Sequence, residues 1–434
     1  MSDSKRSFFR QGAWMVLATL AGGVGMTAVH VVVQRYALEA YSQFKALLGL
    51  FYLVGAAQGG LWNLFAQQTA SALTPAQHSA VASAARRMAI AILIFGAILG
   101  LFLQFNAEAW TEQLKLPNSG ALWATLGLAI ATLELSILRG ILQGQQNFSG
   151  LGWVTILDGL GRCLGVAAIL MLFHGKAAGA IVGALIGNLV ALGVGAWTGR
   201  AAFQGQSGEV PWNGWFARLV PLILTAAAVQ VLTQFDNVFL QGLIPKDRMD
   251  SFRLGERYSP AAQIGFALTQ FTVPLALVMF PRIARSAARS ESTDAVKIAF
   301  LSTLVLGTLA ALGCTLIPGL PVRVLFSKVD LRIATPLVPW FAWAMLLFTL
   351  ANVLLSNLIA QAKFRVVPWM LAIAAIYVIT LWSLRAHLLA VPPADACRLV
   401  VQVIGGCNAA LLAVSAWLTW GGESGVRTPA PTAP

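Results

Sequence analysis

The chain has 434 residues, of which 58% are hydrophobic and only 10% are charged, and its formal net charge is +13. Soluble domains carry about 25% charged residues, so this composition excludes an ordinary soluble globule. The basic residues are scattered over short loops, as in membrane proteins generally, and they do not indicate a nucleic-acid partner.

Long apolar runs dominate the chain. A helix needs about 20 apolar residues to cross the hydrocarbon core of a bilayer, and the sequence offers about twelve such runs. We therefore predict an all-α integral membrane protein, with its helices in two pseudo-symmetric six-helix bundles around a central cavity. The predicted spans are 11–33, 46–65, 88–106, 119–138, 151–173, 177–198, 216–243, 259–280, 296–318, 334–360, 366–384 and 397–420.

These spans divide the chain into five predicted parts. An even number of crossings places both termini on one side, and the basic N-terminus and the loop from Arg282 to Lys297 favour the cytoplasmic side. The basic loop from Lys246 to Arg257 then lies outside, against the rule. The parts are a cytoplasmic N-terminus (1–10), an N-terminal bundle (11–200), a cytoplasmic linker (201–215), a C-terminal bundle (216–420) and a disordered tail (421–434).

The two halves resemble each other at an offset of about 216 residues, read from paired motifs. The segment Phe65–Ala72 parallels Phe280–Ala287, and Leu138–Phe148 parallels Leu355–Phe364. Because six is an even number, two six-helix copies share one orientation, and bundles related in this way can rock about a central site. Chance similarity between apolar segments is the alternative.

Charged residues deep in lipid cost at least about 2.5–3.5 kcal/mol, so they are functional candidates. Asp158 and Arg162 lie four residues apart on the fifth predicted helix and therefore share a face. They form either a self-neutralising pair or a switchable one, in which Arg162 meets an anionic substrate and Asp158 takes a proton. Glu134 on the fourth helix is a possible second partner for Arg162.

Asp236 lies well inside the seventh predicted helix and has no basic residue within one turn. A buried carboxylate without a partner tends to protonate. Asp236 is therefore the best single candidate for coupling transport to H⁺ or Na⁺. A carboxylate with only a structural hydrogen bond is the alternative.

Amides follow one face of two consecutive predicted helices. Amide groups donate and accept hydrogen bonds at once, which suits sugar hydroxyls, but they also hold membrane helices together. Two neighbouring helices with such faces favour a wet, substrate-binding cavity. The residues concerned are Gln230, Gln234, Asn237 and Gln241 on the seventh helix, and Gln263 and Gln270 on the eighth.

Two other features have mainly structural interpretations. Arg139 lies near a helix end, where it either reaches toward lipid headgroups or lines the mouth of the cavity and binds phosphate. The sixth predicted helix repeats a small residue every four positions from Gly179 to Gly195, which is typical of close helix packing.

Motifs of soluble enzymes are absent from the sequence: there is no Walker A, HExxH or GxSxG pattern. The four cysteines and four histidines are scattered without metal-ligand spacing. We therefore predict no catalytic site, no metal and no cofactor, apart from H⁺ or Na⁺ as a coupling ion.

At this point the chain resembles a known family. The segment Leu138–Gly144, followed by Phe148, is similar to the LRGxLQG…F signature that precedes the fifth helix of polysaccharide flippases. The segments Phe235–Leu240 and Val278–Arg282 also resemble that family, which belongs to the multidrug/oligosaccharidyl-lipid/polysaccharide (MOP) exporter superfamily.

The resemblance implies two six-helix bundles around a cavity, and movement of a lipid-linked oligosaccharide across the bacterial cytoplasmic membrane by alternating access. It also implies ion-gradient coupling and work alongside a polysaccharide polymerase and glycosyltransferases. One departure is that only Arg162 lies firmly inside the membrane against three acids, whereas relatives have a strongly cationic cavity. A multidrug or cation/proton antiporter of the same superfamily is the alternative; a membrane-embedded glycosyltransferase or ligase is a third hypothesis, opposed by the short external loops.

Overall fold

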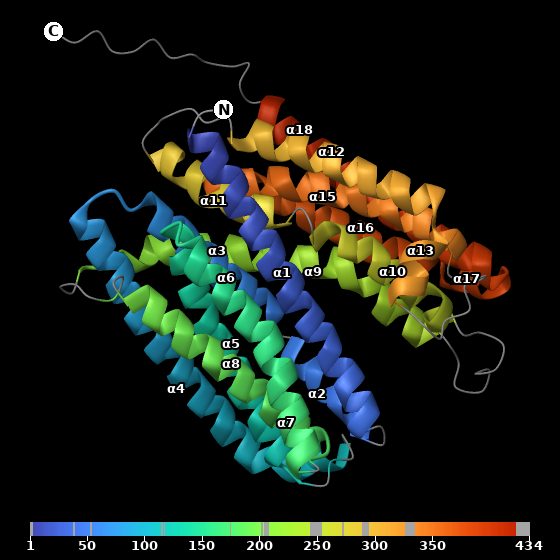
Figure 1. Ribbon diagram of the computed structural model, residues 1–434, viewed down its shortest axis with the longest axis horizontal. Helices are drawn as coiled ribbons and strands as arrows, with labels where there is room; N and C mark the ends of the chain where they lie inside the picture. The colour runs from blue at the N-terminus through green and yellow to red at the C-terminus, as the bar shows by residue number, and fades with distance from the viewer. Residues whose placement is uncertain are drawn as a thin grey trace. The chain divides into compact units, whose positions relative to one another are not determined.

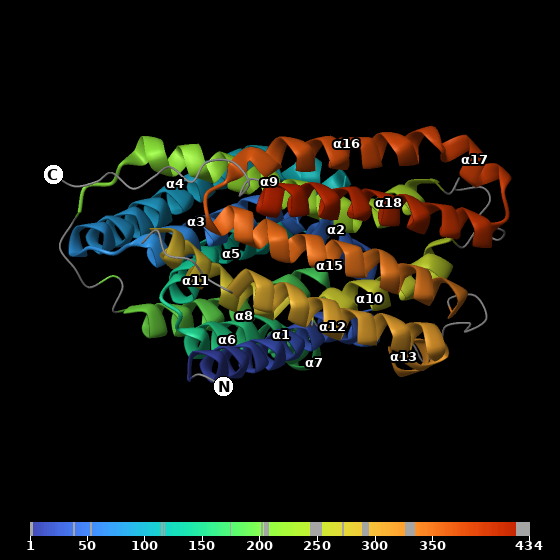
Figure 2. The same cartoon turned by 90° about the horizontal axis from the view of Figure 1, so that it is seen from above.

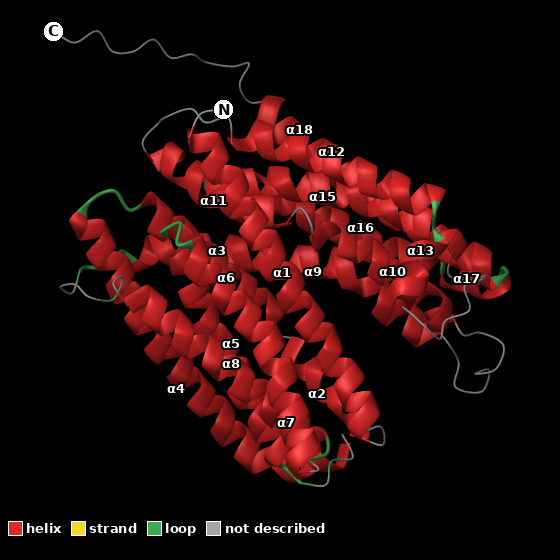
Figure 3. Ribbon diagram, in the orientation of Figure 1, coloured by secondary structure: helices red, strands yellow, loops and turns green. Residues whose placement is uncertain are grey.

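The computed structural model describes most of the chain, and every regular element in the described part is helical (Figure 3). The all-α membrane fold predicted from the sequence is confirmed. Among the described residues, eleven helices are long and apolar enough to cross a membrane. The described residues are 3–37, 40–52, 54–113, 116, 118–173, 175–200, 203, 208–243, 254–270, 273–288, 295–325 and 335–421.

The predicted span 259–280 does not form a single described helix. Its residues fall in α10 (Leu254–Gln270) and α11 (Val273–Ala288), which contain 17 and 16 residues. Pro274 is the second residue of α11, a position where the missing backbone N–H of proline breaks no helical hydrogen bond. The predicted tail from residue 422 onward lies outside the described residues.

Two compact units divide the chain. The first comprises Met1–Gln230 and Leu277–Thr293, and the second comprises Val231–Ala276 and Asp294–Pro434. The division falls inside α9 (Trp212–Leu243), whereas the sequence places the linker at 201–215. The helix boundaries of the two predicted six-helix bundles stay a prediction.

Most helices of the first unit lie in the first half of the sequence (Figure 1). Its buried apolar core joins side chains of α1, α2, α5, α7 and α8. The unit contains α1 (Asp3–Tyr36), α2 (Tyr41–Tyr52), α3 (Gly55–Ser71), α4 (Pro75–Gln113), α5 (Gly120–Gly144), α6 (Phe148–Ile156), the π-helical turn η2 (Leu157–Gly161), α7 (Arg162–Phe173), α8 (Ala177–Gly199) and the start of α9.

In the second unit, α15 packs against α10, α12 and α18, and α18 packs against both α15 and α16 (Figures 1 and 2). Besides the end of α9 and α10, the unit contains α12 (Ala295–Leu316), α13 (Gly319–Leu325), η5 (Thr335–Leu337), α15 (Val338–Ala360), η6 (Phe364–Val366), α16 (Val367–Ser383), α17 (Arg385–Ala390) and α18 (Pro393–Trp420).

The internal repeat leaves a structural trace in one turn of each unit. Gln146, after α5, has φ of 60°, and Ala362, after α15, has φ of 56°. These are the non-glycine residues with positive φ in the described chain, and they lie 216 positions apart. The next residue of each turn donates its backbone N–H to a carbonyl five residues back, Asn147 to Leu142 and Lys363 to Leu358, both at 2.9 Å. The same uncommon turn at the predicted offset supports a duplicated sequence.

Glycines allow helices of the first unit to approach at backbone distance. A Cβ atom added to Gly140 of α5 would lie 2.6 Å from the carbonyl oxygen of Trp62 on α3. One added to Gly144 would lie 2.8 Å from the carbonyl oxygen of Ala66. These separations are too short for any side chain, so α5 and α3 pack with their backbones in contact.

The repeated small residues of α8 have the structural role predicted from their spacing. A Cβ atom on Gly183 would meet the backbone of Gly165, and one on Gly187 would meet that of Gly161. On the opposite side of this segment, Gly25 of α1 faces the backbone of Gly159. The π-helical turn therefore lies between α1 and α8 with almost no intervening side chains.

We predict that Gly140→Ala lowers the thermal unfolding midpoint of the detergent-purified protein, because the added methyl group must push α3 away from α5. Overpacking of this kind costs about 1–3 kcal/mol. The matched control is Gly193→Ala in α8, where an added Cβ meets nothing within 4 Å. The control should keep or raise the midpoint, since alanine favours helix over glycine; equal midpoints for both variants would contradict the close packing.

Candidate functional site

A buried cluster of charged residues joins three membrane segments of the first unit. Arg139 of α5 donates from Nη2 to Oδ2 of Asp158 at 2.7 Å. Arg162, the first residue of α7, donates from Nε to Oδ1 of the same carboxylate at 2.7 Å. We call Arg139, Asp158, Arg162 and Asn188 the charged cluster.

Further polar groups complete the cluster. Asn188 of α8 donates from Nδ2 to Oδ1 of Asp158 at 2.9 Å. Nη2 of Arg162 also lies 3.4 Å from the hydroxyl of Thr132. Aromatic rings cover the two guanidinium groups: Trp62 lies 5.4 Å from Arg139 and Phe51 lies 5.5 Å from Arg162, distances at which a cation is attracted to a ring face.

The position of Asp158 depends on the π-helical turn between α6 and α7. The turn spans Leu157–Gly161, so Asp158 lies on the wider turn and Arg162 directly follows it. Gly159 and Gly161 occupy two of its five positions and contact neighbouring backbones. π-helical turns are rare and are found frequently at functional sites.

The cluster is deeply buried and electrically unbalanced. The side chains of Asp158, Arg139 and Arg162 are only 5–7% exposed, and they lie within apolar spans. Two guanidinium groups share a single carboxylate, which leaves one positive charge in the cluster. In addition, Nε of Arg139 and Oδ1 of Asn188 are buried without a hydrogen-bond partner. Such groups are costly in a membrane interior, which indicates a functional role.

The structure corrects one interpretation of Arg139 and locates Glu134. Arg139 does not reach toward headgroups, because it is 6% exposed and paired with Asp158. The pairing of Asp158 with Arg162 is as predicted. Glu134 is half-buried, and its Oε1 has no hydrogen-bond partner. Among the described ion pairs, Arg162 is joined to Asp158 and not to Glu134.

The second unit contains a buried carboxylate of a different kind. Asp236 of α9 is 4% exposed and accepts a hydrogen bond at Oδ2 from the hydroxyl of Tyr258 on α10, at 2.7 Å. This contact matches the alternative interpretation of Asp236 as a carboxylate with a structural hydrogen bond, and its role in ion coupling stays a prediction. The ring of Tyr258 in turn packs edge-on against Phe341 of α15 at 4.9 Å. Tyr377 of α16 is also fully buried and packs against Phe235.

The predicted amides fall into two groups. Gln230, Gln234 and Gln263 have exposed side chains, which is compatible with contact to a polar substrate. The side chains of Asn237, Gln241 and Gln270 lie outside the described residues. An amide that only holds two helices together would be buried between them, and these three are not.

Several polar residues at these sites were not singled out from the sequence. Gln143 accepts from Nε1 of Trp62 at 2.5 Å and donates to the carbonyl oxygen of Leu277 at 2.9 Å, so it connects α3, α5 and α11. Asn188 is an amide inside a helix made almost entirely of glycine, alanine and aliphatic residues, and that isolation is a usable signal. Tyr258 gives no such signal, because it follows a charged segment.

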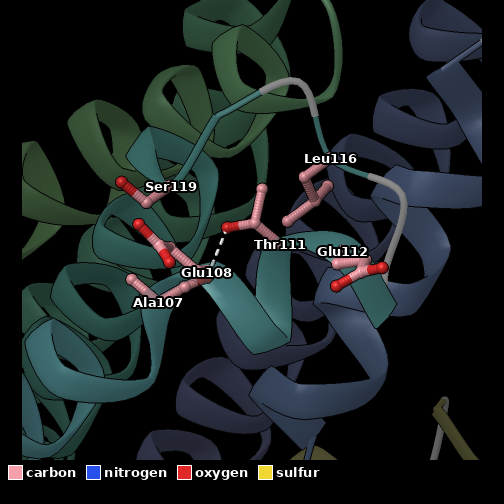
Figure 4. Close-up of a pocket in the computed structure, with 6 residues that line it drawn as sticks. All are labelled: Ala107, Glu108, Thr111, Glu112, Leu116 and Ser119. Carbon is pink, nitrogen blue, oxygen red and sulfur yellow. Dashed lines mark hydrogen bonds between the residues drawn. The ribbon is translucent and has the colours of Figure 1, made fainter.

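A shallow pocket opens at the C-terminal end of α4. It has a volume of about 410 Å³ and is lined by Glu108, Glu112 and Thr111 of α4 together with Ser119 and two apolar residues (Figure 4). The hydroxyl of Thr111 donates to the carbonyl oxygen of Ala107 within the helix. Among the described residues, no group of three or more histidine, cysteine or acidic side chains is arranged to hold a metal ion.

The family model described as "Polysaccharide biosynthesis protein" matches residues 45–287, which is more than half of the chain. The chain belongs to the polysaccharide biosynthesis protein family. The matched region contains the whole charged cluster and the Asp236–Tyr258 pair. No curated protein matches the sequence.

Solved structures of MOP-superfamily transporters share the fold. A variant of the MATE transporter VcmN of Vibrio cholerae has 13% sequence identity, a TM-score of 0.75 and coverage of 96% of each chain. A MOP-superfamily transporter of Pyrococcus furiosus has 12% identity and a TM-score of 0.75, over 99% of this chain and 98% of that one. The eukaryotic MATE transporter AtDTX14 has 13% identity, a TM-score of 0.70 and coverage of 96% and 97%. This family member therefore shares the fold of these transporters.

The charged cluster does not recur in the second half of this family member. At the offset of 216 given by the matching turns, Asp158 corresponds to Ala374 and Arg162 to Val378, both in α16. Asp236 likewise has an apolar counterpart, Leu20 in α1. The duplicated scaffold thus carries different chemistry in its two copies.

We predict that Tyr258→Phe destabilises the protein, because it removes a donor from a buried carboxylate. Hydrogen bonds to charged groups contribute about 1.5–3 kcal/mol. The matched control is Tyr36→Phe, which makes the same change at an exposed side chain of α1. Thermal unfolding in detergent should show a lowered midpoint for Tyr258→Phe alone, and the same loss in both variants would contradict the assigned hydrogen bond.

Proposed function

We propose that the chain is a flippase that moves a lipid-linked oligosaccharide across the bacterial cytoplasmic membrane during polysaccharide biosynthesis. The observation that carries the proposal is the surplus positive charge of the charged cluster, held within a membrane-spanning region. A buried guanidinium group without full compensation suits an anionic substrate. The family match and the transporter fold agree with this function.

The substrate-binding roles follow from the chemistry of the side chains. Arg162 and Arg139 attract the phosphate groups that join the glycan to its lipid carrier, because guanidinium groups bind phosphate oxygens in pairs. The exposed amides Gln230, Gln234 and Gln263 form hydrogen bonds with sugar hydroxyls. The same role is proposed, from the sequence pattern alone, for Asn237, Gln241 and Gln270.

Energy for transport comes from an ion gradient in this proposal, because the sequence has no Walker A motif for ATP hydrolysis. Asp236 with Tyr258 is the proposed H⁺ or Na⁺ site, and Asp158 and Glu134 are secondary candidates for coupling. Both termini face the cytoplasm. The proposed neighbours are membrane lipids, glycosyltransferases that assemble the substrate and a polymerase that uses it.

We predict that Arg162→Ala abolishes surface polysaccharide in a strain that lacks the native gene, while the variant still reaches the membrane. Surface glycan is measured with an antibody or lectin, and membrane level by immunoblot. Arg398→Ala is the control, because Arg398 is about half exposed and forms only a 3.8 Å pair with Asp395. Wild-type glycan in the Arg162→Ala strain would remove this residue from the mechanism.

A cation-coupled multidrug antiporter is the second candidate function. It is favoured by the buried Asp236–Tyr258 pair and by the MATE fold. This function predicts that overexpression confers resistance to cationic dyes and that Asp236→Asn removes the resistance, as measured by minimal inhibitory concentrations. If cells that overexpress the wild-type protein show no dye resistance, the antiporter function is contradicted and the flippase function remains.

A further inference from the structure

We infer that Asp158 is an internal anion that occupies a receptor for a phosphoryl group and gives up its place when that group arrives. The inference rests on the proposed function, because it assigns the chemistry of the same site. The ligand class is a phosphate or diphosphate ester, carried by the lipid-linked substrate. In the structure, the receptor is closed around the carboxylate of Asp158.

The arrangement of donors around Asp158 is that of an oxyanion receptor. Its two oxygens accept hydrogen bonds from Arg139, from Arg162 and from Asn188, at 2.7–2.9 Å. Guanidinium groups bind carboxylate and phosphate with the same paired geometry. A phosphoryl group offers the same oxygens with one more acceptor and more negative charge.

The charge of the cluster fits a phosphoryl group better than it fits Asp158. One carboxylate balances one of the two arginines, and Nε of Arg139 remains buried without a partner. A phosphate ester with two negative charges would balance both guanidinium groups, and its additional oxygen would supply the missing acceptor. The carboxylate of Asp158 therefore interacts with the two arginines less strongly than a phosphoryl group would.

A substitute is needed because an empty receptor would leave two arginines unpaired in the membrane. An unpaired charge is costly there, because lipid offers it no hydrogen-bonding partner. With Asp158 in place, the first unit is stable between transport events. The exchange then makes anion binding depend on displacement of Asp158, which excludes smaller and less charged anions.

The backbone around Asp158 is built to let it leave. Asp158 lies on a π-helical turn, whose i→i+5 hydrogen bonds make it wider than the α-helical segments on either side, and such turns occur frequently at functional sites. Its glycines face the backbones of Gly22, Gly25 and Gly187 and present no side chains that interlock with α1 or α8. A local rotation of the turn can move Asp158 away from the arginines while α5 stays in place.

In the experiment, detergent-purified, full-length protein is titrated with inorganic pyrophosphate, and binding is measured by isothermal titration calorimetry. Asp158→Asn keeps the size of the side chain and removes the competing charge. We expect it to bind pyrophosphate at least tenfold more tightly than the wild type does. Asp395→Asn, the same change at an exposed surface pair, should bind as the wild type does. Adding Arg162→Gln to Asp158→Asn should abolish the gain.

A second variant keeps the inference testable should Asp158→Asn not fold. Asp158→Ser removes the competing carboxylate with a smaller polar side chain and leaves Arg139, Arg162 and Asn188 in place as donors. We expect at least tenfold tighter pyrophosphate binding, as for Asp158→Asn, because the receptor is no longer occupied by an internal anion. Unchanged or weaker binding in the folded variants overturns the exchange. That result leaves the flippase assignment intact, which is judged separately by glycan export in Arg162→Ala cells.

Discussion

The constraint on which the first unit depends is that charge in a membrane interior must be neutralised where it lies. Asp158 meets this constraint in part: it pairs with two arginines, balances the charge of one, and thereby joins α5, the π-helical turn, α7 and α8. Such a cluster needs helices that approach closely, and glycines at the contacts of the turn with α1 and α8 provide the approach. Packing, burial and charge in this unit are therefore parts of one arrangement.

The segment Leu138–Gly144 shows how a family motif acquires physical meaning. Arg139 supplies the ion pair to Asp158, while Gly140 and Gly144 let α5 contact the backbone of α3. Gln143 links Trp62 to the carbonyl oxygen of Leu277. The turn that follows, with its positive φ at Gln146, returns the chain for α6. The turn recurs in the second unit, but the chemistry does not, since apolar residues stand at the positions corresponding to Asp158 and Arg162.

The sequence predicts the features that depend on local composition. Apolar runs reveal the membrane helices, and a spacing of four residues reveals the pair of Asp158 and Arg162. Contacts between distant residues are not encoded in any local pattern: Arg139 lies 19 residues from Asp158, and Tyr258 lies 22 residues from Asp236. For this reason the sequence left open whether Arg139 faces headgroups or the interior, and whether Asp236 has a hydrogen-bond partner.

The central claim is that Arg139 and Asp158 interact directly inside the membrane, and a double-mutant cycle measures that interaction. The unfolding free energies of wild type, Arg139→Gln, Asp158→Asn and the double variant are compared in the same detergent. The account predicts that the double variant loses less stability than the sum of the two single losses, with a coupling energy above about 1 kcal/mol. Losses that simply add would show that the two groups do not interact and would contradict the account.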